Sequence, residues 1–190
     1  MSNIPNWLSA GRAAAAPLLV ALFWLPQWST VSLRAAGIAA ASLFIVAAAT
    51  DFFDGYWARK YGKQTRLGAF LDPAADKLLV VTSLLLLLEA ERAAGGACLL
   101  IIGREVLISA LREWAARDGF IDAVQVVSSG KWKAGVQMTA IPCLFAADME
   151  FLPLIATAGT ILLWIAALLA TWSMVIYARA AWRAQPDADN

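Results

Sequence analysis

Two aspartates near residue 50 have the spacing of residues on one face of a helix, and their carboxylates could take part in chemistry there. Asp51 and Asp54 are three residues apart, and Gly55 and Ala58 extend the set to i, i+3, i+4 and i+7. Residues at that spacing share one face of an α-helix. The small residues beside the carboxylates would allow either close helix packing or the close approach of a bulky ligand.

A second pair of aspartates repeats this pattern on the following helix. Gly68, Asp72 and Asp76 stand at i, i+4 and i+8. Four carboxylates brought together at the ends of two adjoining helices would repel one another, so either some are protonated or cations lie between them. Oxygen ligands without His or Cys suit Mg²⁺ or Mn²⁺. Two such ions sharing carboxylates would form a clamp for in-line displacement at phosphorus.

Simpler interpretations remain open for these residues. Asp72 precedes Pro73, and the two could be the N-cap and first residue of a helix, which is compatible with a ligand role. Asp51 and Asp54 could also be solvated charges in a loop.

The composition places this acidic group in a membrane protein. Of the 190 residues, 61% are hydrophobic and 15% are charged, and the mean hydropathy is +0.67, whereas soluble domains are about 45–50% apolar and 25% charged. With 15 basic and 14 acidic residues, the chain has no basic excess that would suit nucleic acid. The absence of histidine excludes His-based catalysis and His-ligated metals.

Apolar segments long enough to span a bilayer recur along the whole chain. The sequence predicts an all-α membrane protein with six transmembrane helices, at about 7–26, 33–57, 70–89, 94–115, 132–147 and 153–178. With a cytoplasmic N-terminus, only Arg34 and Arg92 lie outside, as the positive-inside rule requires. Six tryptophans fall near the predicted span ends, where indole favours the interface: Trp7, Trp24, Trp28, Trp132, Trp172 and Trp182. We expect one domain over 1–184 and a polar tail at 185–190.

The segment from Asp51 to Asp76 resembles the signature of the CDP-alcohol phosphotransferases, D-x2-D-G-x2-A-R-x8-G-x3-D-x3-D, at every fixed position. The resemblance implies a six-helix membrane enzyme that transfers a phosphatidyl or similar group from a CDP-linked donor to an alcohol and releases CMP. It further implies that Asp51, Asp54, Asp72 and Asp76 bind two divalent ions, Mg²⁺ or Mn²⁺, and that Asp76 is also the general base. Four residues would line the CDP site: Gly55, Ala58, Arg59 and Gly68.

Three further stretches resemble the bacterial phosphatidylglycerophosphate synthase subfamily. Asn3–Arg12 is similar to its N-I-P-N-x-L-T-x-x-R opening, Gly103–Trp114 to its R-E-x-x-I-S-x-L-R-E helix, and Gly130–Met138 to its G-K-x-K-T-x-x-Q-M segment. This likeness implies CDP-diacylglycerol as donor, glycerol 3-phosphate as acceptor, and an inner-membrane enzyme with its active site facing the cytoplasm. The subfamily is often dimeric, and the Ala-rich helices are compatible with a homodimer.

The negative charge of glycerol 3-phosphate gives a physical argument for the same acceptor. Glycerol 3-phosphate is a dianion and needs cations of its own, which Arg104 and Arg112 on one helix and Lys131 and Lys133 at the start of the next could supply. Alternatively, the lysines only anchor a helix end, and Arg112 pairs with Glu105 or Glu113.

Two other functions remain as alternatives. A cardiolipin synthase would use the same chemistry with phosphatidylglycerol in place of glycerol 3-phosphate, and another CDP-alcohol phosphotransferase would use a different acceptor. A divalent-cation or proton-coupled transporter could also place aspartates within spans, but it would need polar residues through the remaining depth. The outer parts of the predicted spans are almost wholly apolar, which favours an enzyme with a site open to one side.

Overall fold

Helices and the short connections between them make up the described chain in the computed structural model, which describes residues 4–61, 66–121, 130–147 and 153–184. Within these ranges, the side chains of 4–10, 12–13, 51–61, 66–73 and 130–134 lie outside the description. The long helices are α1 (Ile4–Trp28), α2 (Leu33–Tyr61), α3 (Arg66–Glu89), α4 (Gly95–Arg117), α6 (Gly130–Ala146) and α7 (Pro153–Ala184). The prediction of an all-α fold is confirmed for this part of the chain, and each of these helices covers most or all of one predicted span.

Local signals in the sequence set several helix ends. Ser32 precedes α2, and its Oγ accepts a hydrogen bond from the backbone N–H of Ala35 at 3.2 Å, as an N-cap does. After α3, Glu91 adopts a left-handed conformation (φ 57°), and the N–H groups of Arg92 and Ala93 both bond to the carbonyl of Leu87. Gly119 (φ +82°) follows α4 in the same way. These turns end α3 and α4.

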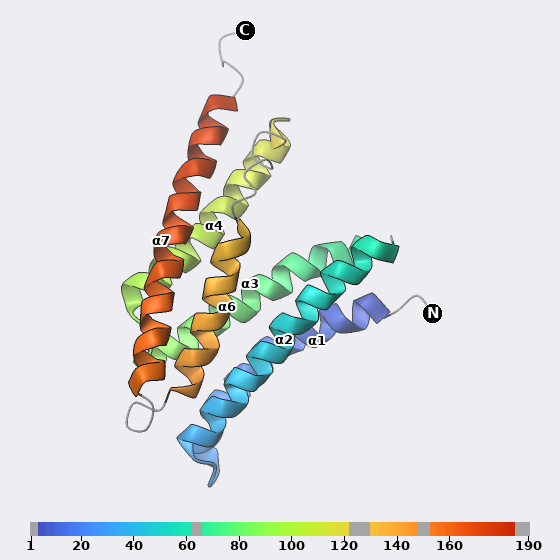
Figure 1. Ribbon diagram of the computed structural model, residues 1–190. Coiled ribbons are helices and arrows are strands. Elements are labelled where there is room, and N and C mark those ends of the chain that lie inside the picture. Colours follow the sequence, from blue (N-terminus) through green and yellow to red (C-terminus); the bar gives the residue numbers. More distant parts are fainter. Residues whose placement is uncertain (1–3, 62–65, 122–129, 148–152, 185–190) are drawn as a thin grey trace.

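One end of the molecule is a closed apolar bundle. Figure 1 shows the helices converging toward the end that holds the α1–α2 and α6–α7 connections. Phe44 of α2 is fully buried there, together with Leu19, Leu79, Ile141 and Leu163 from the neighbouring helices. We call this end the closed end. Its core contains residues of all six long helices, so it fixes their relative positions.

At the opposite end, the helices separate into two arms (Figure 1). In one arm, α1 packs against both α2 and α3. In the other, α4 packs along α7 through a separate cluster of buried residues that includes Ile108, Ala115, Phe120, Tyr177 and Ala181. The ring of Trp114 meets that of Phe120 edge-on at 5.1 Å between centroids. We call this end, where the arms diverge, the open end.

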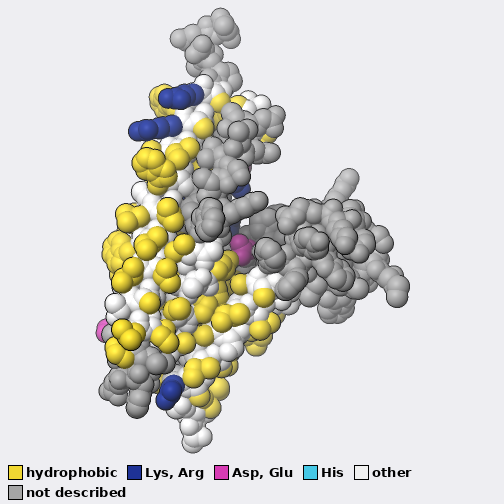
Figure 2. Space-filling model, in the orientation of Figure 1, with side chains coloured by type: hydrophobic (Ala, Val, Ile, Leu, Met, Phe, Trp, Pro, Cys, Tyr) yellow, Lys and Arg dark blue, Asp and Glu magenta, His cyan; other side chains and the backbone are white. Residues whose placement is uncertain are grey.

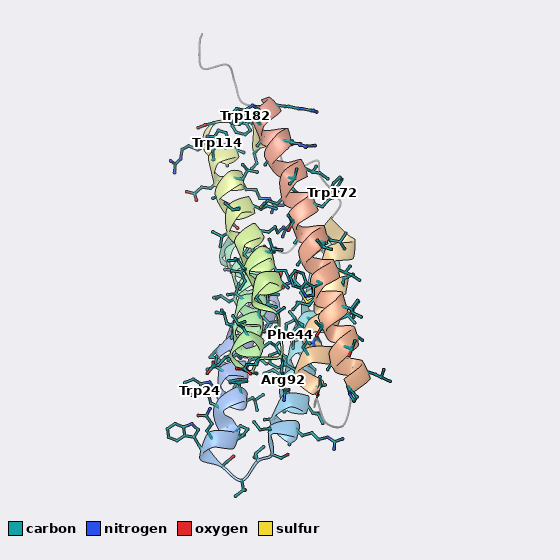
Figure 3. The ribbon with its side chains drawn as sticks, turned by 90° about the vertical axis from the view of Figure 1, so that its left-hand side faces the viewer. Trp24, Phe44, Arg92, Trp114, Trp172 and Trp182 are labelled. Carbon is teal, nitrogen blue, oxygen red and sulfur yellow. The ribbon has the colours of Figure 1, made fainter. Side chains whose placement is uncertain are left out.

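Many large hydrophobic side chains are exposed on the described helices, among them Leu99, Leu154 and Trp172. Two helices of the described chain meet a length and hydropathy test for a membrane span, over Leu33–Thr50 and Pro153–Ala184. On the face that Figure 2 shows, hydrophobic side chains are spread along the described helices, and basic groups lie near the top and the bottom. Trp24 is exposed near one end of the molecule and Trp182 near the other (Figure 3). This distribution is that of a protein whose sides face lipid.

Candidate active site

The signature aspartates lie at the open end, on helices that continue through them. Helix α2 remains helical to Tyr61 and α3 begins at Arg66, so a four-residue connection brings the two motif-bearing helix ends to the same arm (Figure 1). Asp51 and Asp54 are therefore helical and do not lie in a loop. Asp72 lies well inside α3, so it is not the N-cap of that helix, and the N-cap interpretation is wrong.

Most side chains of the signature lie outside the described residues. This applies to the metal and CDP candidates Asp51, Asp54, Gly55, Ala58, Arg59, Gly68 and Asp72. Their helical register still places Asp51 and Asp54 on one face of α2, and Asp72 and Asp76 on one face of α3. The side chain of Asp76 is described and is half-buried.

A hydrogen bond joins the two arms directly beside Asp76. Lys77, the next residue of α3, donates from Nζ to Oγ of Ser109 on α4 at 2.5 Å. The Ser109 hydroxyl in turn donates to the backbone carbonyl of Glu105 at 2.6 Å. The aspartate end of α3 is thereby held against the middle of α4. Figure 2 shows an acidic side chain where the arms meet.

Arg104 is the most buried of the predicted acceptor cations that are described. Its side chain is only 17% exposed, and its Nη1 forms an ion pair with the carboxylate of the adjacent Glu105. Its Nε is buried and has no hydrogen-bond partner among the described residues. A half-buried guanidinium with an unused donor is costly unless a ligand completes its bonding.

The level of Arg104 along the helix pair is informative. Helix α4 packs along α7, and buried residues of both helices belong to one cluster before this level, with Ile101 and Leu163, and to another after it, with Ile108 and Tyr177. Ser173 of α7 lies in the same interval, and its buried Oγ also lacks a described partner. Two buried polar groups without a described partner, on two helices that pack together, mark a region that suits a polar ligand.

Arg112 has a different environment from the one expected. It lies two turns beyond Arg104, is exposed, and places its guanidinium carbon 5.7 Å from the centre of the Tyr177 ring. The alternative pairings are wrong, because Glu105 pairs with Arg104 and Glu113 pairs with Arg117 at 3.4 Å. Lys131 and Lys133 fall in the first turn of α6, and their side chains lie outside the described residues.

The hydrogen bond between Lys77 and Ser109, which joins the two arms, was not predicted from the sequence. Lys77 follows the last signature aspartate, and Ser109 stands in the stretch Gly103–Trp114 that drew attention for its arginines. Each is an ordinary polar residue in its own helix. Only the crossing of α3 and α4 brings them together.

The described residues do not by themselves form a metal site. Among the side chains that the structure describes, no group of three or more carboxylates or cysteines could hold an ion. Asp76 is the one signature carboxylate in that set. Its position at the junction of the arms is compatible with a ligand role, and its oxygen-only chemistry suits Mg²⁺ or Mn²⁺.

Comparison with known proteins identifies the family. The family model for CDP-alcohol phosphatidyltransferases matches residues 2–172. The chain belongs to this family. A protein of Yersinia enterocolitica named CDP-diacylglycerol–glycerol-3-phosphate 3-phosphatidyltransferase is 40% identical over 95% of this chain and 96% of its own length.

Two plant proteins similar to this chain carry different names. An Arabidopsis thaliana protein named CDP-diacylglycerol–glycerol-3-phosphate 3-phosphatidyltransferase 1, chloroplastic/mitochondrial, is 41% identical over 95% of this chain. An Oryza sativa protein named cardiolipin synthase (CMP-forming) is 43% identical over the same share. The chain spans 63% and 58% of the length of these two relatives, respectively.

Proposed function

We propose that the chain transfers the phosphatidyl group of CDP-diacylglycerol to sn-glycerol 3-phosphate, giving phosphatidylglycerol phosphate and CMP. The acceptor hydroxyl oxygen forms a bond to the β-phosphorus, the bond from that phosphorus to the CMP oxygen breaks, and the acceptor proton passes to Asp76. The family match over residues 2–172 supports the chemistry. The Yersinia relative of nearly equal length supports the acceptor.

Two divalent ions complete the proposed site. Asp51, Asp54, Asp72 and Asp76 would hold them, because these residues are placed in register on the adjoining ends of α2 and α3. Bound ions would neutralise the diphosphate and stabilise the departing CMP. The small residues Gly55, Ala58 and Gly68 would admit the cytidine diphosphate close to the helices, and Arg59 would contact it.

The observation that carries the acceptor assignment is the unpartnered Nε of Arg104. Arginine can present two parallel N–H groups to a phosphate, and here one donor is buried and unused. The Lys77–Ser109 hydrogen bond holds this stretch of α4 beside Asp76. We therefore propose that Arg104 binds the phosphate of the acceptor. Three further basic residues, Arg112, Lys131 and Lys133, would lie nearer the cytoplasmic entrance of the site.

The proposed topology follows from the same arrangement. All six long helices would cross the bilayer, and the open end would face the cytoplasm. The apolar sides of the described helices and the exposed tryptophans near opposite ends support this placement. A bacterial inner membrane is the proposed location, since the relative covered almost completely by this chain is bacterial.

An acceptor-swap assay tests the proposal. Purified protein would receive CDP-diacylglycerol and Mg²⁺ or Mn²⁺ with glycerol 3-phosphate, phosphatidylglycerol, or neither, and CMP release would be measured. We expect release only with glycerol 3-phosphate, and none after chelation of the metal. Release with phosphatidylglycerol alone would refute the acceptor assignment while leaving the reaction class intact.

Cardiolipin synthesis is the second candidate, because a plant relative with that name is 43% identical. A phosphatidylglycerol acceptor carries its phosphate as a diester on a lipid and needs fewer cations. Arg104→Ala separates the two activities: it should weaken the use of glycerol 3-phosphate much more than that of a lipid acceptor.

A further inference from the structure

A cavity lies at the closed end, away from the signature aspartates. It has a volume of about 220 Å³ and is lined by residues of α1, α2, α3, α6 and the α3–α4 turn. Phe23 and Leu87 give it apolar walls, whereas Ala36, Gly37 and Ala90 leave the space open by having little side chain. Nothing in the proposed reaction uses this cavity.

Arg92 brings a positive charge into the lining. Its side chain is half-buried, and Nη1 donates to the backbone carbonyl of Phe145 at 2.8 Å near the end of α6. No carboxylate among the described residues forms an ion pair with it; the described ion pairs involve Arg104 and Arg117. A guanidinium has five N–H groups, so the bond to Phe145 leaves donors for a further acceptor.

The backbone around Arg92 is built closely enough to hold the guanidinium in place. A Cβ atom on Gly37 would lie 2.5 Å from the Phe145 oxygen and 3.4 Å from Nη1 of Arg92. The absence of a side chain at Gly37 therefore permits the contact between α2 and the Arg92–Phe145 junction. A fixed charge beside an apolar cavity costs free energy unless an anion compensates it.

The depth of the cavity indicates which anion is available. Figure 3 shows Arg92 beyond Phe44, near the level of the exposed Trp24. Indole rings favour the lipid headgroup region, so the guanidinium lies where phospholipid phosphates lie. The apolar lining of Phe23, Leu33 and Leu87 suits the glycerol and the first carbons of the acyl chains.

We propose that this cavity binds the phosphodiester of a membrane glycerophospholipid, with Arg92 donating to the phosphate, at a site separate from catalysis. Gln27, which also lines the cavity, would supply a polar group at its mouth. The acyl chains would run outside the cavity along the apolar helix surfaces. This inference rests on the placement of the helices in a bilayer and is independent of the acceptor assignment.

Native mass spectrometry of the detergent-purified full chain tests the site. The probe is dioleoyl phosphatidylethanolamine, which neither proposed reaction consumes, and dioleoylglycerol is the matched lipid without phosphate. We expect one tightly held phospholipid per chain and no comparable binding of dioleoylglycerol. Arg92→Ala should weaken phospholipid binding about tenfold, as loss of a charge-assisted hydrogen bond does.

Two further variants separate binding from folding. Ala90→Trp fills the cavity from a half-buried turn position and leaves the Arg92–Phe145 bond in place, so it should remove the bound phospholipid while helical content and monodisperse elution are kept. Arg34→Ala, an exposed change on α2, should leave binding unchanged. Equal retention by wild type, Ala90→Trp and Arg92→Ala, or equal binding of dioleoylglycerol, would overturn the proposal.

Discussion

The closed and open ends of this protein treat buried polar groups in opposite ways. At the closed end, the buried Ser83 hydroxyl donates to the carbonyl of Leu79 at 2.7 Å, and the Arg92 guanidinium donates to that of Phe145. At the open end, Arg104 Nε and Ser173 Oγ are buried without a described partner. Native proteins rarely leave such groups unsatisfied. This contrast supports the proposal that the acceptor binds at the open end, beside Arg104.

The two ends also differ in packing: the closed end has one core shared by all six long helices, and the open end does not. Side chains of all six long helices meet around Phe44, so a change there affects the whole bundle. Beyond this core, α4 and α7 form a cluster of their own, and only a few contacts join α3 to α4. The closed end therefore sets the stability of the fold, and the open end consists of two semi-independent arms.

The largest expected effect lies at the open end. Asp76→Asn keeps the size of the side chain but removes the proposed base and a metal ligand, so CMP release should fall by at least about 10²–10⁴-fold, the range for general base catalysis. Steady-state CMP release measures it. Asp118→Asn, an exposed change just after α4, is the matched control and should retain activity. Near-normal turnover by Asp76→Asn would remove this residue from the chemistry.

The next effect is on stability at the closed end. Phe44→Ala leaves a large cavity in a side-chain environment with no exposure, and it should lower the free energy of unfolding by about 3–5 kcal/mol. Unfolding in mild detergent followed by circular dichroism measures this loss. Ile45→Ala, on the exposed side of the same helix and 53% exposed, should cost much less. Equal losses would show that Phe44 is not at the centre of the bundle.

A smaller effect tests whether the unsatisfied arginine binds substrate. Arg104→Ala should raise the KM for glycerol 3-phosphate about 10–100-fold, which corresponds to the loss of a hydrogen bond to a charged group. The KM for CDP-diacylglycerol should change little. Arg117→Ala, which removes an exposed arginine paired with Glu113 on the same helix, provides the comparison. An unchanged acceptor KM in Arg104→Ala would show that the buried guanidinium is only structural.

The smallest effect concerns the tie between the arms. Ser109→Ala removes the acceptor of the Lys77 ammonium and should cost about 1 kcal/mol of unfolding free energy. A double-mutant cycle with Lys77→Met should return a coupling energy of the same size. Ser42→Ala, which deletes an exposed hydroxyl bonded within its own helix, should have almost no effect. Additive losses would mean that the arms are not joined through this bond.

Much of the architecture could be predicted from the sequence because the signals that specify a long apolar helix lie within the segment itself. A run of apolar residues, a cap such as Ser32 and a turn such as Glu91–Arg92 each determine an element without reference to the rest of the chain. The signature spacing likewise placed Asp51 and Asp54 on one helix face, because the helical period alone decides that.

Only the tertiary structure decided which polar groups meet. The sequence placed Arg104 and Arg112 on one helix as equivalent cations, but packing against α7 leaves one half-buried with a free donor and the other exposed beside Tyr177. The pairing of Lys77 with Ser109, 32 residues apart, depends on the crossing of α3 and α4. Burial and long-range contacts are properties of the assembled bundle, and a local sequence pattern does not determine them.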